Sequence, residues 1–575
     1  MKNLAVLGAG DRLSTALIHG IRSSISADCR QLGGDGKALD EPLAVHRPEV
    51  VVCLPGVRGG EGGVPDLRRA EADFRSVLEA EPRQVIVVSS AAAYEPSHHH
   101  PGRVTEGRPP RKVANPVSVR WLETEQLAEE LFSDSGATLT ILRPATVAHS
   151  GGADFLSRLL SARVALTLPG HDPTLQLLAV EDLARAIAHV IQARCEGIFH
   201  VAPAGEISLR RALRLAGVRR VPVPRWMQRL GRWLLRGWAL SPAHLDFIRY
   251  PWTVSGDKLE TELGFVPERS SAEVAARLSS QAVDAEEVAR AEGDGFGMDK
   301  GYIGAYGKTL FRFLHDAYWR IEHRGLEHVP DEGRGVLVGV HRGFMPWDGV
   351  MLLHLVAREL ERYPRFLIHP ALAKPPFLCN YMTKLGGILA CQENAGWVLE
   401  REGLLGIFPE GIQGAFTPYR RAYEIGKLGR DEYVKIALRH QAPLIPVVTV
   451  GSAEIYPILG RVDWRWFKRY TEWPYLPLTP TFPILPVPLP SKWHTRFLEP
   501  IHVERDYPPE AADDPPTVRA ISQRVRHVME EAIAEMLRRR SSIFFGSVFE
   551  PLAPAGDTSS DPSREPAGDE KQGVA

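Results

Sequence analysis

The stretch Gly335-Val-Leu-Val-Gly-Val-His-Arg-Gly-Phe-Met-Pro-Trp-Asp348 joins an apolar run to a loop that carries a histidine and a carboxylate. Residues 335–340 predict a short buried strand, because consecutive apolar residues bounded by turn residues are typical of one. A histidine at a strand end, with a carboxylate a few residues on, is the minimal set for general-base chemistry. The imidazole takes a proton from a hydroxyl and the carboxylate orients the ring. The stretch therefore predicts His341 as a base and Asp348 as its partner.

A second polar motif, Phe408-Pro-Glu-Gly411, follows another apolar run and places Glu410 in a tight turn at a strand end. The order and spacing of the two motifs resemble the glycerolipid acyltransferase family, with its histidine box and its F-P-E-G box. Further segments resemble the family's lead-in strand, second box and closing strand, and Pro-rich segments are similar to its monoacylglycerol-acyltransferase-like branch. These segments are 324–330, 385–394, 442–447, 475–483 and 489–493. The resemblance covers residues 301–545 and implies an α/β acyltransferase domain there.

The resemblance also implies the reaction and its residues. A fatty acyl group moves from acyl-CoA or acyl carrier protein to a hydroxyl of a glycerolipid or related lipid alcohol, and no cofactor is required. His341 is the general base, Asp348 orients it, and Glu410 helps to hold the acceptor. The residues implied to contact substrate are Arg342, Gly343, Phe408, Pro409, Gly411, Arg420 and Arg421.

Two departures from the family pattern bear on this interpretation. Pro346 stands where the commonest H-x-x-x-x-D pattern places its aspartate, and Asp348 lies two residues further on. A bulge over 343–346 is expected to return Asp348 toward His341. Glutamines, Gln392 and Gln413, lie near the positions at which family members bind a glycerol phosphate through arginine. The acceptor is therefore left open between a phosphate-bearing lipid and a neutral lipid or long-chain alcohol.

The composition of the chain bounds its class. With 575 residues it is expected to hold two or three domains. Its 69 Lys and Arg balance 70 Asp and Glu, which removes a bulk electrostatic case for nucleic acid as a partner. Five cysteines show no Cys-x-x-Cys and no His/Cys cluster with zinc spacing, so no metal is expected. The chain begins as a strand, and no run approaches the ~20 apolar residues that span a bilayer. A cytoplasmic protein, peripheral on the inner face of the membrane, is expected, and its oligomeric state is left open.

The amino-terminal half follows a different pattern. The run Leu4-Ala-Val-Leu-Gly-Ala-Gly10 indicates a buried strand entering a glycine turn, and a helical pattern follows. A dinucleotide-binding unit begins in this way, with phosphate at the helix amino terminus, so Gly8 and Gly10 are cofactor-binding candidates. Later strand-like segments at 50–56, 85–94 and 139–144 extend the pattern. Residues 1–280 resemble the extended short-chain dehydrogenase/reductase family of the NAD-dependent epimerase type, which implies a Rossmann-like, doubly wound parallel sheet.

The catalytic Tyr-x-x-x-Lys pair of that family is missing from this half. Aligned on the flanking Pro and Glu of the motif, Val117 stands at the tyrosine and Trp121 at the lysine. Valine has no ionisable group, and an indole N–H only donates, so neither residue supports hydride transfer. If the alignment were shifted, Tyr94 is the only tyrosine within residues 1–249, and His98 stands where its lysine is needed. We expect a redox-inactive half with at most a vestigial NAD(P) site.

Composition also predicts the connecting segments and two contacts with a membrane surface. Residues 281–300 are expected to form a linker, and 546–575, rich in Pro, Ser, Gly and acidic residues, a disordered tail. Residues 225–238 place four arginines on one helical stripe beside Trp and Leu, which fits an interfacial helix or a lid packed on its own domain. The aromatic, Pro-rich segment 464–493 fits the rim of an acyl-chain entrance or a braced loop over the sheet.

Two other functions stay open at this point. The protein is a bifunctional NAD(P)-dependent reductase or epimerase and acyltransferase if the amino-terminal half is active. It is a lipid-surface scaffold if neither half is catalytic.

Overall fold

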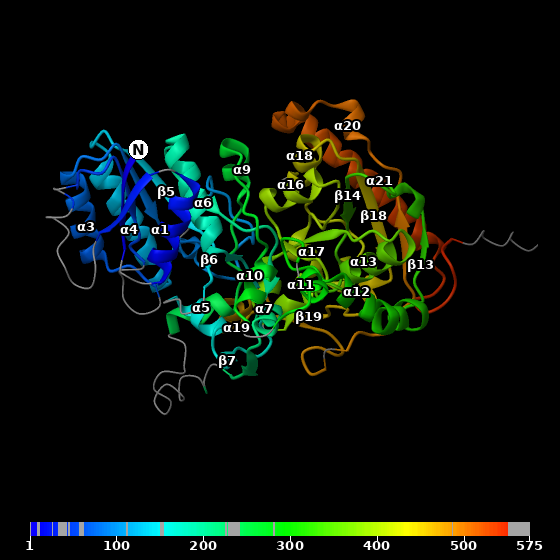
Figure 1. Cartoon of the computed structure of the whole chain (residues 1–575). Coiled ribbons are helices and arrows are strands. Elements are labelled where there is room, and N and C mark those ends of the chain that lie inside the picture. The colour runs from blue at the N-terminus through cyan, green and yellow to red at the C-terminus, as the bar shows by residue number, and fades with distance from the viewer. Residues whose placement is uncertain are drawn as a thin grey trace, which may run out of the picture.

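The computed structural model describes residues 2–549, apart from 9–11, 26, 33–42, 44–45, 57–62, 111–112, 150–153, 225–226, 228–241, 280–281, 292, 376, 430 and 486. Two lobes make up this part of the chain (Figure 1). The first is built on a six-stranded sheet and the second on a seven-stranded sheet. None of the helices in the described ranges has the length and apolar composition needed to cross a membrane.

The first lobe is a doubly wound α/β unit. Its strands run in parallel in the order β10-β5-β4-β3-β1-β2. Both faces are covered: alternate residues such as Val51 and Val52 face separate cores, one with α3 and α4 and the other with α1 and α6. These elements are β1 (Lys2–Leu7), α1 (Arg12–Ser24), β2 (Ala27–Leu32), β3 (Val50–Cys53), α3 (Leu67–Glu79), β4 (Gln84–Val88), α4 (Pro116–Phe132), β5 (Thr138–Pro144), α6 (Val180–Ala193) and β10 (Gly197–Val201). The Rossmann-like fold expected for this half is confirmed.

Smaller elements complete the first lobe beside the sheet. They are η1 (Ala91–Ala93), β6 (Thr146–Val147), α5 (Phe155–Leu160), β7 (Val164–Thr167), β8 (Thr174–Leu175), β9 (Leu177–Leu178), β11 (Ile207–Ser208), α7 (Leu209–Leu215), β12 (Arg219–Pro222), η2 (Pro242–His244), η3 (Asp246–Ile248), α9 (Asp257–Leu263) and α10 (Ser271–Arg277). They surround the carboxyl ends of the strands, which is where doubly wound sheets bind ligands.

The second lobe has the order β13-β21-β18-β14-β17-β15-β16, parallel except where β18 meets β21. Neighbouring residues of β14 face opposite cores: Leu337 packs with α13, and Val338 with α16, α18 and α21. The strands are β13 (Glu322–Arg324), β14 (Gly335–Gly339), β15 (Arg365–Ile368), β16 (Ile388–Leu389), β17 (Leu404–Ile407), β18 (Leu444–Val450) and β21 (His494–Phe497). The mixed α/β fold expected for this half is confirmed.

Helices cover both faces of the second sheet, and a short hairpin, β19 with β20, stands apart from it. These elements are α12 (Lys300–Tyr306), η4 (Gly307–Phe311), η5 (Leu314–Tyr318), η6 (Leu326–His328), α13 (Trp347–Glu359), α14 (Pro370–Ala373), α15 (Leu378–Lys384), α16 (Gln392–Glu400), α17 (Gly411–Ala415), η7 (Tyr419–Arg421), α18 (Glu432–Arg439), η8 (Ser452–Glu454), β19 (Gly460–Val462), α19 (Arg465–Thr471), β20 (Leu476–Leu478), α20 (Val503–Asp506), η9 (Pro509–Asp513) and α21 (Pro515–Arg539).

The segment expected to be a linker is packed between the lobes. It contains α11 (Ala285–Ala291), and Phe296 is 7% exposed and makes an edge contact with Trp397 of the second lobe. The segment thus connects the lobes and packs against both of them. The start of the expected tail also packs: Val548 is 2% exposed in the core of the second lobe. The rest of the tail and nearly all of the arginine stripe at 225–238 lie outside the described residues.

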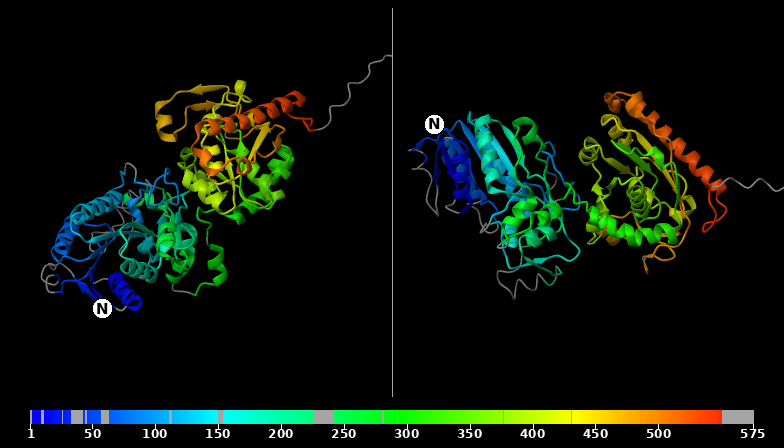
Figure 2. Two further views of the ribbon diagram at one scale, coloured as in Figure 1. Left: turned by 90° about the horizontal axis from the view of Figure 1, so that it is seen from above. Right: turned by 45° about the vertical axis from the view of Figure 1, so that its right-hand side comes forward.

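The two lobes lie side by side and contact each other directly (Figure 2). The Asn394 side chain donates to the Pro101 carbonyl at 2.7 Å. The backbone N–H of Asp172 donates to the Asn380 side chain at 2.9 Å. A backbone hydrogen bond from Phe377 to Gly170 adds a third link at 2.8 Å. Side chains of each lobe are therefore held in register with the other.

Candidate active site

The sheet of the second lobe brings its two polar motifs together. β14 pairs in parallel with β17, and Val338 stands opposite Ile407. His341 follows the first strand and Glu410 the second, and the carboxyl ends of neighbouring parallel strands meet at one edge of a sheet. Tertiary pairing thus joins motifs that lie about seventy residues apart in the sequence.

His341 and Asp348 form a hydrogen-bonded pair at this edge. The His341 Nδ1 atom lies 2.6 Å from Asp348 Oδ2, which also accepts from the backbone N–H of Arg342 at 2.9 Å. The other oxygen, Oδ1, accepts from the Gly349 N–H at 2.9 Å. Asp348 lies in the first turn of α13, where the helix dipole favours a negative charge. The longer spacing past Pro346 therefore still delivers the carboxylate to the imidazole, by way of a loop in which Gly343 has φ +70°.

Glu410 and Arg342 form a buried ion pair beneath that edge. Their side chains are 1% and 2% exposed, with Nη1 and Oε2 2.6 Å apart. The second Glu410 oxygen accepts from the Gly426 N–H at 2.6 Å, and Arg342 also donates to the carbonyls of His341, Ala422 and Glu424. Both were expected to contact substrate, but their polar atoms are engaged within the protein and neither lines the pocket. The pair joins the loop of His341 to the loop after β17.

A largely apolar pocket opens beside His341. Phe408 and Gly411 line it, as predicted, while Gly343, Pro409, Arg420 and Arg421 do not. Both of these arginines are exposed, and Arg421 pairs with its neighbour Glu424 at 2.6 Å. The principal further lining residues are Phe344, Leu353, Phe366, His369, Met382, Phe416 and Trp473. They come from five separate segments. Phe344 lies in the quoted histidine stretch and Trp473 in the aromatic segment 464–493, whereas the others carry no local signal in the sequence.

His369 is a second imidazole in the pocket wall. Its Nδ1 accepts from the Ala371 N–H at 3.2 Å and caps α14. Burial lowers its pKa, so the ring is neutral at physiological pH. The sequence did not point to His369 as a pocket residue. A histidine before a proline can also serve only as a helix cap.

The crevice of the first lobe lies at the switch point of its sheet, where the strand order reverses between β1 and β3. Val117 and Trp121, one turn apart on α4, line it beside Ser89 and Ser90. This is the arrangement that the alignment predicts for a replaced catalytic pair. The Ser89 hydroxyl donates to the buried Glu125 carboxylate, so it is engaged within the protein.

The described residues of this crevice lack a hydride-transfer pair and are closely packed at the strand ends. A Cβ built on Gly8 would lie 2.5 Å from Ser14 Oγ, and one on Gly56 would lie 2.5 Å from the Trp121 ring. The indole thus fills space at the strand ends beside Gly56. Gly10, the other predicted cofactor residue, lies outside the described part of the chain.

Tyr94 is likewise withdrawn from the crevice. Its hydroxyl accepts from Arg143 Nη1 at 2.6 Å and lies 3.0 Å from His200 Nε2. Arg143 in turn forms a bidentate pair with Glu125. Burial raises the pKa of the Tyr94 phenol, which favours its neutral form. The tyrosine belongs to a buried polar network and cannot replace the missing catalytic one.

Comparison with known proteins bears on the second lobe first. A family model described as acyltransferase matches residues 320–450. An uncharacterized protein of Mycobacterium tuberculosis is 35% identical over 259 residues, which are 44% of this chain and 72% of that protein. The chain belongs to the acyltransferase family. The matched range of this acyltransferase contains β14, β17 and the His341–Asp348 pair.

Other relatives of the acyltransferase extend the comparison. An uncharacterized protein of Mycobacterium leprae is 35% identical over 259 residues, 44% of this chain and 70% of that protein. A second uncharacterized protein of M. tuberculosis is 27% identical over 203 residues, 33% of this chain and 52% of its own length.

Solved structures are similar to about half of the acyltransferase chain. A UDP-N-acetylglucosamine 4-epimerase from Bacillus cereus is 14% identical and covers 48% of this chain and 98% of its own, with a TM-score of 0.37. A dTDP-4-dehydrorhamnose reductase from Bacillus anthracis is 15% identical over 48% of this chain and 99% of its own, also at 0.37. TM-scores of 0.37 are too low to establish a shared fold. The fold of the first lobe is assigned from its own sheet order.

Proposed function

We propose that this acyltransferase moves a fatty acyl group from a thioester of CoA or acyl carrier protein to the hydroxyl of a lipid alcohol, with His341 as general base. The observation that carries the proposal is the His341–Asp348 pair at the mouth of an apolar pocket. Because Asp348 engages Nδ1, the free lone pair of the neutral ring is on Nε2. That nitrogen is the one available to a hydroxyl in the pocket.

The proposed reaction is a direct transfer. His341 Nε2 removes the hydroxyl proton as the alcohol oxygen attacks the thioester carbonyl, and Asp348 stabilises the imidazolium. The carbon–sulfur bond then breaks, the ester remains on the alcohol, and the imidazolium returns its proton to the leaving thiolate. No covalent acyl-enzyme is required. The Arg342–Glu410 pair acts from beneath, by holding the two motif loops in register.

The pocket favours a neutral acceptor. Its lining contains no lysine or arginine in the described part of the chain, and its titratable members are His341, Asp348 and His369. Arg420 and Arg421, the cations expected near a phosphate, are exposed outside the pocket. A neutral glycerolipid or long-chain alcohol therefore suits this lining better than a phosphate-bearing lipid does, because a buried phosphate without a cation is strongly unfavourable.

A surface contact with the inner face of a membrane is proposed for α19 and its flanks. Trp464, Trp466 and Tyr470 are 52%, 61% and 63% exposed, and the last two rings stack at 5.5 Å. Exposed arginines at 461, 465 and 469 alternate with them, which suits an anionic headgroup layer. Trp473, just past this helix, lines the pocket. A lipid could thus pass from the aromatic surface to His341.

The two alternative functions fit less well. A bifunctional reductase or epimerase is disfavoured, because Val117 and Trp121 stand in the crevice where the catalytic tyrosine and lysine are needed. The hydrogen-bonded His341–Asp348 pair speaks against a scaffold without catalysis.

Substituting the base tests the proposal. Purified protein is given acyl-CoA and monoacylglycerol in mixed micelles, and both free thiol and diacylglycerol are measured. His341→Ala should lower both rates by ~10²–10⁴-fold. His527→Ala, on the exposed face of α21, is the control and should act as the parent does. Equal activity of the parent and His341→Ala would remove His341 from the mechanism.

A further inference from the structure

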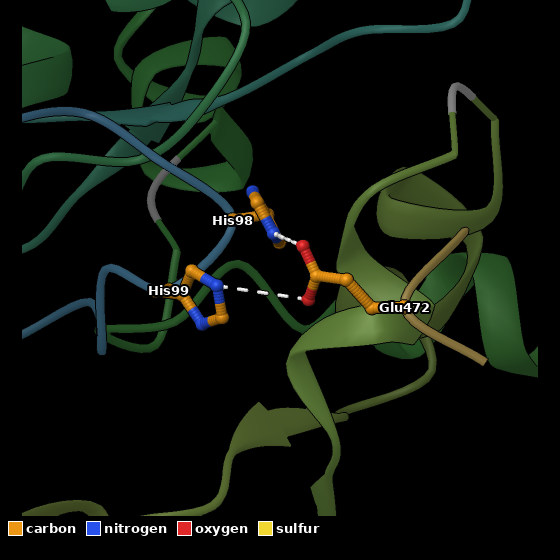
Figure 3. Close-up of side chains that lie close together, drawn as sticks. All are labelled: His98, His99 and Glu472. Carbon is orange, nitrogen blue, oxygen red and sulfur yellow. Dashed lines mark hydrogen bonds and ion pairs between the residues drawn. The ribbon is translucent and has the colours of Figure 1, made fainter. Parts of the chain in front are cut away.

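Three metal-ligating side chains from the two lobes converge at the lobe junction. His98 and His99 belong to the loop after η1 of the first lobe, and Glu472 ends α19 of the second. Figure 3 shows both imidazoles directed at the carboxylate. His98 Nε2 lies 2.7 Å from Glu472 Oε1, and His99 Nε2 lies 3.6 Å from Oε2. The three ligand atoms all lie within 4.8 Å of one another.

This spacing is near what a tetrahedral zinc ion requires. With zinc–ligand distances of ~2.0–2.1 Å, tetrahedral ligand atoms lie about 3.3 Å apart. The carboxylate distances of 2.7 and 3.6 Å bracket that value, so small rotations of the side chains would complete the geometry. Two imidazoles and one carboxylate are also a donor set that zinc prefers, and they leave a fourth position for water.

The surroundings keep the ligands in place. The Asn394–Pro101 and Asp172–Asn380 hydrogen bonds fix the lobes beside the cluster. Glu472 itself has a left-handed backbone with φ +61°, which turns its side chain away from the helix axis toward the first lobe.

A cation already lies beside the carboxylate. Lys374 Nζ donates to Glu472 Oε1 at 2.8 Å and to the Arg469 carbonyl at 3.3 Å. The ammonium occupies one of the directions from which a metal would approach, and its long, flexible side chain can turn away into solvent. Lys374 is therefore a competitor of the metal, and its removal should favour metal binding.

We propose that His98, His99 and Glu472 bind a zinc ion that links the two lobes. No spacing in the sequence predicted this site, because Glu472 lies 374 residues after His98 and only the tertiary fold joins them. The residue after Glu472, Trp473, forms part of the wall of the acyl pocket. The proposed zinc site therefore adjoins the active site and shares none of its polar residues.

Calorimetric titration of the full-length protein with Zn²⁺, against a competing chelator, tests the proposal. We expect one zinc ion per chain in the parent. His99→Ala and Glu472→Gln should each weaken binding by ~10-fold or more, and Lys374→Met should strengthen it severalfold. Saturating Zn²⁺ should raise the thermal midpoint of the parent but not that of His99→Ala. His99 is more than half exposed, so its removal should leave the fold intact.

The matched control is His527→Ala, which removes an imidazole that lies 3.3 Å from Glu531 on an exposed helix. It should bind Zn²⁺ as the parent does. Absence of binding by the parent, or equal affinity of the parent and His99→Ala, would overturn the site. An unchanged or weaker affinity of Lys374→Met would overturn the claim that its ammonium competes with the metal.

Discussion

Replacing Asp348 with asparagine tests the geometry of the base most directly. The carboxylate accepts three hydrogen bonds, from His341 Nδ1, Arg342 N–H and Gly349 N–H, and its side chain is 4% exposed. Asparagine keeps the shape but has one acceptor oxygen and one amide nitrogen. Whichever way the amide lies, at least one of these donors then faces an N–H₂ group. No orientation restores the parent arrangement.

The two orientations lower activity for different reasons. If the amide nitrogen faces His341, it donates to Nδ1 and shifts the ring proton to Nε2, so that nitrogen can no longer accept a proton. If the oxygen faces His341, the tautomer survives, but the charge that stabilises the imidazolium is lost and the Gly349 N–H loses its acceptor, at a cost of about 1–3 kcal/mol. We expect kcat/KM to fall by ~10²–10³-fold, within the ~10²–10⁴-fold range typical of general-base catalysis.

Thiol release from acyl-CoA, measured beside ester formation, gives kcat and KM for each variant. Asp316→Asn is the matched control, because Asp316 makes a similar contact with His315 Nδ1 at 2.8 Å outside the pocket. It should keep parent activity. If Asp348→Asn stays within twofold of the parent while folding normally, another group orients His341 and the mechanism above is refuted.

Three further predictions concern other parts of the molecule. Titration of the full chain with NADH or NADPH should give weak or undetectable binding and no oxidoreductase turnover; micromolar affinity would contradict the fit argued from Trp121 and Gly56. Trp464→Ser with Trp466→Ser should reduce co-sedimentation with anionic vesicles severalfold while sparing activity on a short-chain soluble acceptor, and the exposed Val266→Ser is the control; unchanged sedimentation would exclude this surface. Burial lowers the pKa of His100 and His200 to about 3, against about 6.5 when unfolded, so the unfolded chain binds more protons below pH 6.5. The free energy of unfolding in urea should therefore fall as pH drops from 6.5 toward 4, less steeply in His100→Gln.

Glu410 shows that a motif can predict the position of a residue without predicting the direction of its side chain. Its position after β17 was predicted, and the structure has it there. Its side chain nevertheless faces Arg342 and Gly426 within the protein. Removing one partner of such a buried pair typically costs 3–5 kcal/mol, so loss of activity in a Glu410 variant has to be read beside a stability measurement.

By itself, the sequence determined five of the central strands, the fold class of each lobe and the two motif loops, because strand signals are local: apolar runs predicted β1, β3, β4, β14 and β17. It also identified the replaced pair at Val117 and Trp121, because the flanking Pro116 and Glu125 align with the Tyr-x-x-x-Lys motif that the amino-terminal half resembles. Only the tertiary structure decided which side chains share a space. The contact of Asp348 with His341 depends on the path of one loop, and the withdrawal of Arg342 and Glu410 from the pocket on burial. The meeting of His98 with Glu472 depends on how two lobes pack, and no spacing along the chain encodes that distance.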